Sequence, residues 1–422
     1  MSKNTLWLYK KWVESHTNTM EKQWLAMAKK EYPQMQKDRR YLHKNAEVGF
    51  DLRATFAYVE KRLKGLGYMP KPIGRYAMIA EIGTGDRCVL LRADMDGLPI
   101  REKSGEPFAC IDGRMHACGH DLHTAMLLGA AAILKKKEKE LPRRVRLLFQ
   151  PAEETLQGAK DCVDAGVLDG VDGATMLHVL PAMPFAAGTV IVSAPGVSAP
   201  AADFFDLAVT GKGCHGSSPW QGVDAALVGA KILTGLETLA SREIAPSHPA
   251  TLTVGQFQAG DADNAIANKA VLSGTMRAVD EGTRAYMKER LVKIATATAN
   301  AYRARAKVVW KSGCPCLQND EQMSKTALEC AKIALGKKYV LSAGDLPKGG
   351  VGGSEDFAYI AQRVPSVMAG ICAGSKGQGF DEPLHSPRVR FDEGCMPYGA
   401  AYFAAVAFSA QIPAAKTTPK KI

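Results

Sequence analysis

Residues 88–95 read CVLLRADM, a short apolar run of strand length that ends in acidic residues. Further runs of strand length follow at Val145–Phe149 and Gly173–Val179, and the segments Asp121–Lys137 and Gly158–Ala165 between them have helical patterns. Strands that alternate with helices are typical of a parallel sheet with crossover connections. We therefore predict an α/β domain with a mostly parallel sheet.

The order of the expected elements changes after Pro195. The next six expected elements follow the order β-α-β-β-α-β of a ferredoxin-like module. They are Asp203–Gly211, Asp224–Ser241, Thr251–Ala259, Ala270–Val279, Gly282–Tyr302 and Ala306–Lys311. The α/β pattern resumes with the helix Gln322–Leu335 and the strand Ser366–Cys372. We predict one discontinuous domain, residues 1–195 and 312–422, that carries an inserted α+β domain, residues 196–311.

Length and composition limit the class of protein. The chain has 422 residues, 46% of them hydrophobic and 23% charged, which suits two globular domains. The longest apolar runs, Ala125–Leu134 and Ala400–Phe408, are shorter than the ~18 residues of a membrane span. The N-terminus has no apolar signal region, and the ten cysteines are scattered rather than spaced as a disulfide framework. We expect a cytoplasmic protein with free thiols that does not bind membranes.

The net charge of +11 raises the possibility of a nucleic-acid partner. The basic run Lys135–Lys137 is followed directly by Glu138 and Glu140, as on a solvated helix face. We found no basic groove with interleaved aromatic residues in the sequence. We therefore expect no nucleic-acid partner.

The segment Met115–His123, MHACGHDLH, is the richest in chemistry. It holds three of the nine histidines and one cysteine. Imidazole and thiolate groups are preferred ligands of zinc and related metals. The segment alone predicts a metal site only weakly.

Other polar side chains follow predicted strands, where open α/β sheets place their sites. Taken singly, each is better explained by a core histidine or a capping carboxylate. Their convergence at strand ends favours a shared site. They are Asp94, Asp96, Glu153, Glu154, His178 and His385.

Four motifs resemble those of a known family. MHACGHD (115–121), FQPAEE (149–154), KGCHGSSP (212–219) and GGSEDF (352–357) are similar to motifs of metal-dependent amidohydrolases related to aminoacylase, hippurate hydrolase and indole-acetyl-amino-acid hydrolase. The resemblance runs from about Arg39 to the helix near Phe408. It implies a catalytic α/β domain with an inserted lid domain that commonly pairs two subunits, and hence a homodimer.

The resemblance also implies roles for particular residues. It implies two divalent metal ions, which could be zinc, manganese, cobalt or nickel, with Cys118 as the bridging ligand. Asp96 matches the position that orients the site. Asp94 stands where relatives use a histidine ligand, so its role is open. The implied ligands are Cys118, His120, Glu154, His178 and His385.

Glu153 matches the general base of the family, and His215 matches the histidine that polarises the scissile carbonyl, often across the dimer interface. Asn264 and Arg277 match positions that hold the carboxylate of the amino acid, and a guanidinium fork suits a carboxylate. Alternatively, His215 is an exposed loop histidine and Arg277 a surface strand residue.

Two residues depart from the family pattern. Trp220 replaces a frequent histidine, and Cys214 replaces a usual glycine, so the choice of substrate is open. The resemblance implies a hydrolase that cleaves the amide bond of N-acyl amino acids or related conjugates, releasing a carboxylic acid and a free amino acid. The alternatives are a dipeptidase or carboxypeptidase acting on short peptides, and a metal-free binding protein that has kept the fold.

Overall fold

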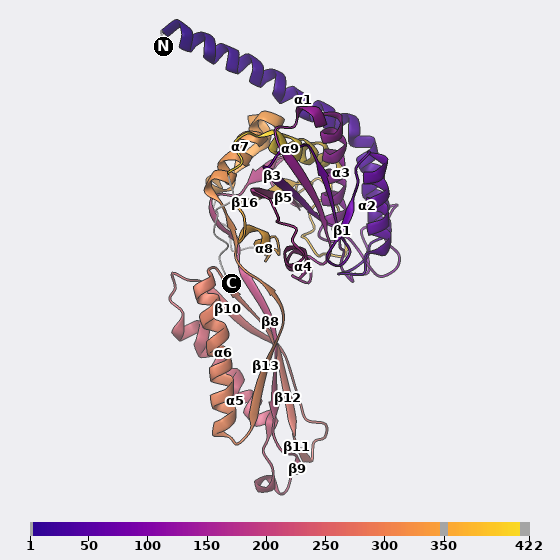
Figure 1. Ribbon diagram of the computed structural model, residues 1–422. Coiled ribbons are helices and arrows are strands. Elements are labelled where there is room, and N and C mark those ends of the chain that lie inside the picture. Colours follow the sequence, from indigo (N-terminus) through magenta and orange to yellow (C-terminus); the bar gives the residue numbers. More distant parts are fainter. Residues whose placement is uncertain (1–2, 347–352, 414–422) are drawn as a thin grey trace. The chain divides into compact units, whose positions relative to one another are not determined.

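The computed structural model describes residues 3–346 and 353–413, with side chains from residue 23 onward. It divides the chain into two compact units, whose helices and strands are labelled in Figure 1. The first unit comprises Met1–Ser198, Gln318–Gly349 and Tyr359–Ile422, and the second comprises Ala199–Leu317 and Gly350–Ala358. These division points lie near the domain boundaries predicted from the sequence. That the two parts are independently folding domains stays a prediction.

An eight-stranded sheet forms the centre of the first unit, in the order β1-β2-β4-β3-β5-β16-β6-β15. The central strands β4, β3, β5 and β16 are mutually parallel, which confirms the predicted mostly parallel sheet. The pairs β1-β2, β2-β4 and β16-β6 are antiparallel, so the complete sheet is mixed. The strands are β1 Lys71–Ile73, β2 Ala77–Ile82, β3 Cys88–Asp94, β4 Arg144–Gln150, β5 Gly173–Leu180, β6 Val190–Val192, β15 Val340–Ser342 and β16 Ser366–Cys372.

Helices α3 (His120–Lys136), α7 (Glu321–Leu335) and α9 (Met396–Phe408) pack against this sheet, and α1 (Lys3–Lys44) packs across all three. Residues 120–134 of α3 are all buried, because the helix contacts strands as well as α1 and α9. The shorter helices are α2 (Arg53–Gly65), α4 (Gly158–Asp164) and α8 (Ala358–Ala361). None of the described helices is both long and apolar enough to cross a lipid bilayer.

A buried network of charges fixes the first turn of α3 to the end of α1. The carboxylate of Asp121 lies 2.8 Å from Arg39 Nε and 2.8 Å from His43 Nδ1. The other ring nitrogen of His43 lies 3.0 Å from Glu102. Paired in this way, the buried charges hold the beginning of α3, and therefore the loop that precedes it, in one place.

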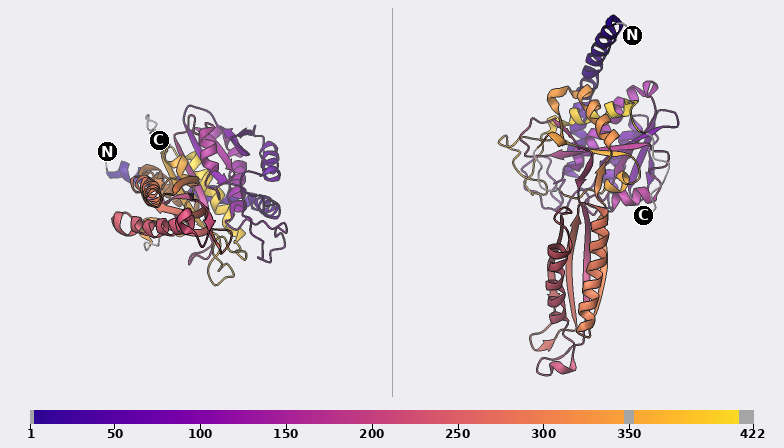
Figure 2. Two further views of the ribbon diagram at one scale, coloured as in Figure 1. Left: turned by 90° about the horizontal axis from the view of Figure 1, so that it is seen from below. Right: turned by 90° about the vertical axis from the view of Figure 1, so that its left-hand side faces the viewer.

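The second unit is an antiparallel sheet with two helices, and it confirms the predicted ferredoxin-like order. Its strands have the order β10-β12-β8-β13, and helices α5 (Ala225–Thr238) and α6 (Glu281–Ala301) lie together along them (Figure 2). Alternate residues of β8, including Phe205, Leu207 and Val209, are buried against these helices. The strands are β8 Ala201–Thr210, β10 Ala250–Ala259, β12 Lys269–Ala278 and β13 Arg305–Cys314. Two short pairs join β9 (Cys214–His215) to β11 (Ala265–Ile266), and β7 (Gly196–Ala199) to β14 (Leu317–Asn319).

Candidate metal centre and active site

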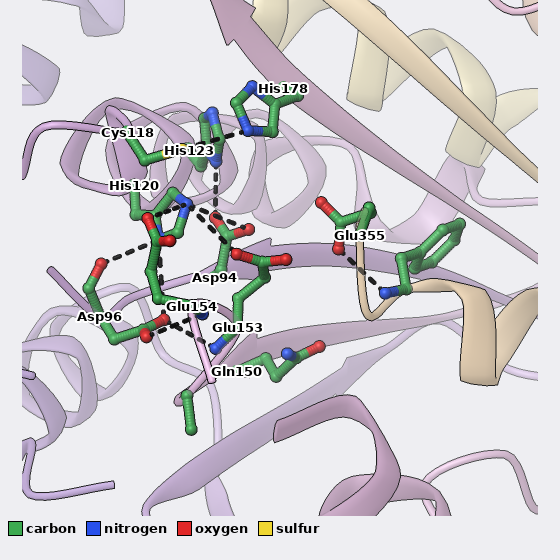
Figure 3. Close-up of polar contacts among 12 residues, drawn as sticks. Asp94, Asp96, Cys118, His120, His123, Gln150, Glu153, Glu154, His178 and Glu355 are labelled. Atoms are coloured by element: carbon green, nitrogen blue, oxygen red, sulfur yellow. Dashed lines mark hydrogen bonds and ion pairs between the residues drawn. The ribbon is translucent and has the colours of Figure 1, made fainter. Parts of the chain in front are cut away.

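The predicted site residues of the first unit come together at the carboxyl ends of three parallel strands. Asp94 is the last residue of β3, Glu153 and Glu154 follow β4, and His178 lies near the end of β5 (Figure 3). Neighbouring parallel strands end at the same edge of a sheet, so side chains that follow them can converge. The start of α3 lies at this edge as well, because its first residue, His120, contacts the carboxylates.

Two groups of three potential ligands share the sulfur of Cys118. In each group the ligand atoms lie within 4.8 Å of one another. The first group is Cys118, His120 and His178, in which Cys118 Sγ lies 3.4 Å from His178 Nε2. The second is Cys118, Glu154 and His385, in which His385 Nε2 lies 3.4 Å from Glu154 Oε1. This arrangement suits two ions that share one thiolate ligand.

Two buried polar atoms in these groups lack a hydrogen-bond partner among the described residues. They are Nε2 of His120 and Oε1 of Glu154. Leaving a buried polar group without a partner costs about 1–3 kcal/mol. A cation bound in each group would satisfy the unpaired atom of that group, and the mixed sulfur, nitrogen and oxygen set suits zinc, manganese, cobalt or nickel. The residues present therefore fit a pair of divalent ions.

The thiol of Cys118 is tuned toward its ionised form. Burial alone would raise its pKa, but the neighbouring imidazoles of His178 and His120 outweigh burial and lower the pKa to about 6. The thiolate, rather than the thiol, is the form that binds metal. Cys118 therefore has the ionisation that a ligand requires.

Gly119, between two of the potential ligands, allows the start of α3 to approach β5. Its φ of +84° lies in the left-handed region. A Cβ atom at this position would lie 2.3 Å from a side-chain carbon of Val179. Only glycine avoids both problems, so Gly119 is needed to bring Cys118 and His120 close to His178.

Asp96 fixes the backbone that carries the two glutamates. Its carboxylate oxygens accept hydrogen bonds from the backbone N–H of Glu153, at 3.0 Å, and of Glu154, at 3.2 Å. Its backbone carbonyl oxygen lies 2.8 Å from Nδ1 of His120, which donates this bond. The ring is thereby oriented with Nε2 toward Glu154 Oε1, 3.9 Å away. Burial raises the pKa of Asp96.

The backbone of two site segments is strained. Ala152, directly before Glu153, has φ of +56°, and His385 has φ of +66°. For residues with a Cβ this left-handed region costs about 1–3 kcal/mol, and such strain concentrates at functional sites. The N–H of His385 donates to the carbonyl of Ala117 at 3.0 Å, which joins its loop to the segment before Cys118.

Glu153 lies beside the two groups and is nearly buried. Its Oε2 is 4.0 Å from His120 Nε2, and with His120 and Glu154 it forms a further cluster of potential ligand atoms. Both glutamates therefore face the same small volume, from consecutive positions of one strained turn. Glu153 is close enough to exchange a proton with a water molecule held there.

Three residues around the site, Arg92, His123 and Gln150, were not predicted from the sequence to have a role there. Asp94, whose role the sequence left open, is contacted by Arg92 at 2.7 Å and by His123 at 2.5 Å, and Gln150 in turn contacts Arg92 at 2.9 Å. A signal was present for two of them. Arg92 is a charged residue in an otherwise apolar strand, and His123 belongs to the histidine-rich segment.

The remaining predicted residues lie in the second unit. His215 is exposed on β9, and its neighbour Gly216 donates a hydrogen bond to the carbonyl of Asn264 at 2.7 Å. His215, Asn264 and Cys214 border a hollow of about 420 Å³. Trp220, on the loop that follows, is 72% exposed.

Arg277 lies elsewhere in the second unit, near the carboxyl end of β12. Its guanidinium donates a hydrogen bond to the hydroxyl of Ser354, a residue of the GGSEDF motif. Gly352, the first residue of that motif, lies outside the described residues. The structure thus brings His215 and Asn264 together. Asn264 precedes the start of β12, whereas Arg277 lies near the opposite, carboxyl end of that strand.

Comparison with known sequences gives the same family. The sequence pattern of Peptidase family M20/M25/M40 matches residues 90–409. The chain is 37% identical over 370 residues to the N-acetyl-L-cysteine deacetylase of Bacillus subtilis, covering 86% of this chain and 85% of the relative. It is 33% identical over 405 residues to the IAA-amino acid hydrolase ILR1-like 2 of Arabidopsis thaliana, covering 94% and 90%.

A solved structure agrees. The crystal structure of a Bacillus subtilis protein described as a dinuclear metal binding peptidase from the M20 family aligns with a TM-score of 0.73 at 30% identity, covering 90% of this chain and 98% of that one. Fold, motifs and sequence identity extend over nearly the whole chain. The chain belongs to Peptidase family M20/M25/M40, a family of metal-dependent amidohydrolases and peptidases.

Proposed function

We propose that this protein hydrolyses the amide bond of N-acyl amino acids or related amino-acid conjugates, releasing a carboxylic acid and a free amino acid. The observation that carries the proposal is the pair of ligand groups that share Cys118 beside Glu153. Two of the relatives, the N-acetyl-L-cysteine deacetylase and the IAA-amino acid hydrolase, support this choice of substrate class.

In this proposal, Cys118, His120 and His178 would hold one divalent ion, and Cys118, Glu154 and His385 would hold the other. Such ions lower the pKa of bound water toward ~7 and polarise a carbonyl oxygen. Glu153 takes a proton from the attacking water and then delivers it to the departing amine nitrogen. Asp96 keeps Glu153 and Glu154 in place by accepting hydrogen bonds from both backbone N–H groups.

His215 is proposed to stabilise negative charge on the scissile carbonyl oxygen. Its Nδ1 accepts a hydrogen bond from the N–H of Ser217 at 3.2 Å and lies 2.7 Å from the hydroxyl oxygen of Ser217, which can donate to the same nitrogen. A backbone N–H can only donate, so the ring proton of neutral His215 is on Nε2. An exposed N–H donor of this kind suits the stabilisation of a developing oxyanion.

Asn264 and Arg277 are proposed to bind the carboxylate of the amino acid. Arg277 is near the end of β12, whereas Asn264 precedes the start of that strand, so about 25 Å of strand separates them at ~3.3 Å per residue. One second unit cannot bring both residues to one carboxylate. We therefore propose a homodimer in which His215 and Asn264 complete the site of the partner subunit.

The acyl group is proposed to be uncharged. A substrate with a free amino terminus would need an acidic partner, and we assign none. The test is a panel of N-acetyl, N-benzoyl and long-acyl amino acids together with dipeptides. Each is assayed after chelation and again after zinc, manganese, cobalt or nickel is returned.

We expect hydrolysis of N-acyl amino acids that chelation abolishes and one or more of the metals restores. Preferential hydrolysis of dipeptides would instead identify a peptidase. Binding of the panel without any metal-restored hydrolysis would identify a binding protein and contradict the proposal.

A further inference from the structure

The buried imidazole of His123, one turn after His120 in α3, joins the site to the backbone of β5. Its Nδ1 lies 2.5 Å from Asp94 Oδ1, and its Nε2 accepts a hydrogen bond from the N–H of Val179 at 2.8 Å. Because Nε2 accepts, the ring proton is on Nδ1 and points to Asp94. Both nitrogens of His123 are therefore engaged, although Asp94, His120 and His123 are near enough to form a metal-binding group.

The bond to Val179 forms where β5 loses a neighbouring strand. The register of β3 and β5 ends at the pair Arg92 and Met176, while β5 continues in register with β16 as far as Leu180. A buried backbone N–H beyond the end of that pairing still needs an acceptor. His123 supplies it for Val179, and so takes the place of the missing strand.

Val179 in turn orients the ring of its neighbour His178. The carbonyl of Val179 lies 2.8 Å from Nδ1 of His178 and accepts its proton. The Nε2 atom of His178 consequently faces Cys118 Sγ, 3.4 Å away. Val179 thus connects the two histidines. Its N–H donates to His123, and its carbonyl orients the ring of His178.

Asp94 is occupied in holding His123. Its Oδ1 contacts His123, and its Oδ2 contacts Arg92 at 2.7 Å. Arg92 is fully buried and is also held by Gln150. Each carboxylate oxygen of Asp94 therefore has a cationic or N–H partner from the protein, which favours an orienting role over metal ligation.

We propose that His123 is a positioning residue that sets the orientation of His178, and thereby the affinity of the metal position formed by Cys118, His120 and His178, with Asp94 as its orienting partner. This inference rests on the proposed function, because it concerns the same pair of ions. Partners of this kind behind metal ligands typically change metal affinity by about 10- to 100-fold when removed.

The experiment compares His123→Asn with His123→Gln. The Asn side chain can donate to Asp94 but does not reach Val179, whereas the Gln side chain extends far enough to accept from the Val179 N–H. The matched control is His116→Asn, because His116 is buried in the same segment and its ring nitrogens have no hydrogen-bond partner among the described residues. The full-length chains are stripped of metal and titrated with Zn²⁺ against a chromophoric chelator, with bound zinc counted by mass spectrometry.

We expect two zinc ions per chain in the wild type, in His123→Gln and in His116→Asn. We expect His123→Asn to bind one ion normally and the other about 10- to 100-fold more weakly. Two unweakened ions in His123→Asn would overturn the inference and leave the proposed function intact. An equal weakening of zinc binding in a folded His123→Gln chain would also overturn the inference and leave the proposed function intact. This second variant keeps the test valid if the His123→Asn chain does not fold. A wild type that binds fewer than two ions would overturn both proposals, and this outcome is read before any variant is compared.

Discussion

The sulfur of Cys118 lies 3.4 Å from Nε2 of His178, although the two residues are 60 positions apart in the chain. They meet because Gly119 lets the start of α3 approach the end of β5. The same sulfur also belongs to the group formed with Glu154 and His385. Cys118 is therefore the residue on which both proposed metal positions depend.

Replacement of this thiol tests the sharing directly. We expect Cys118→Ala to lower the zinc content from about two ions per chain to below one, because both groups lose the same ligand. Cys330→Ala is the matched control, since Cys330 is a buried thiol on α7 in the core and belongs to neither group. Metal content measured on both purified variants decides the point. Loss of a single ion in Cys118→Ala would show that the sulfur is not shared.

Glu153→Gln separates proton transfer from metal binding. The amide keeps the size of the side chain but cannot take a proton from water. We expect two ions per chain and a kcat lower by about 10²- to 10⁴-fold, the usual contribution of a general base. Steady-state kinetics with an N-acyl amino acid, alongside metal analysis, is the measurement. Near-normal turnover in the metal-replete variant would remove Glu153 from this role.

Mixing two inactive variants tests whether the site is built from two subunits. His215→Ala lacks the proposed carbonyl donor, and Glu153→Gln lacks the base. A mixed dimer contains one site in which the intact Glu153 of one chain meets the intact His215 of the other. We expect activity to appear after the two proteins are mixed under conditions that exchange subunits. If His215 acts within its own chain, the mixture stays inactive.

We expect Asp280 to make the stability of the second unit depend on pH. It caps α6, accepting a hydrogen bond from the N–H of Thr283 at 2.7 Å, and this bond is the main reason that its pKa falls to about 2. A carboxylate whose pKa is lower in the folded chain stabilises it above its unfolded pKa, here 3.8. That contribution is lost as the pH falls from about 4 through 2.

We expect Asp280→Ala to lower the free energy of unfolding by ~1 kcal/mol at neutral pH. The difference from wild type is expected to disappear progressively below pH 4. Denaturant unfolding at a series of pH values measures it, with Asp280→Asn as a capping residue that does not titrate. A wild-type advantage that persists unchanged at pH 2 would contradict this account of the carboxylate.

Much of the first unit could be predicted because its signals are local. The apolar strand that ends in Asp94, and the strand Ser366–Cys372, are visible as runs between turn residues. Because open α/β sheets place their sites at the carboxyl ends of strands, the sequence predicts that Glu153, Glu154 and His178 lie close together, without any knowledge of distances. The strands β1, β2, β6 and β15 were missed, because runs of three to six residues carry too little periodicity to stand out.

The supporting residues could not be predicted, since their roles depend on contacts between distant segments. Nothing near His123 in the sequence indicates that its ring would take the N–H of Val179. Likewise, Arg92 is recognisable as an unusual charge in an apolar strand, but only the fold supplies Asp94 and Gln150 as its partners. The roles of His215, Asn264 and Arg277 stay predictions.

Anomalous diffraction from crystals of the zinc-loaded protein tests the central claim most directly. The account predicts two anomalous peaks, both at about 2.3 Å from Cys118 Sγ, a normal zinc–sulfur bond length. One peak should also contact His120 and His178, and the other Glu154 and His385. A single peak, or peaks that do not touch Cys118, would contradict the account.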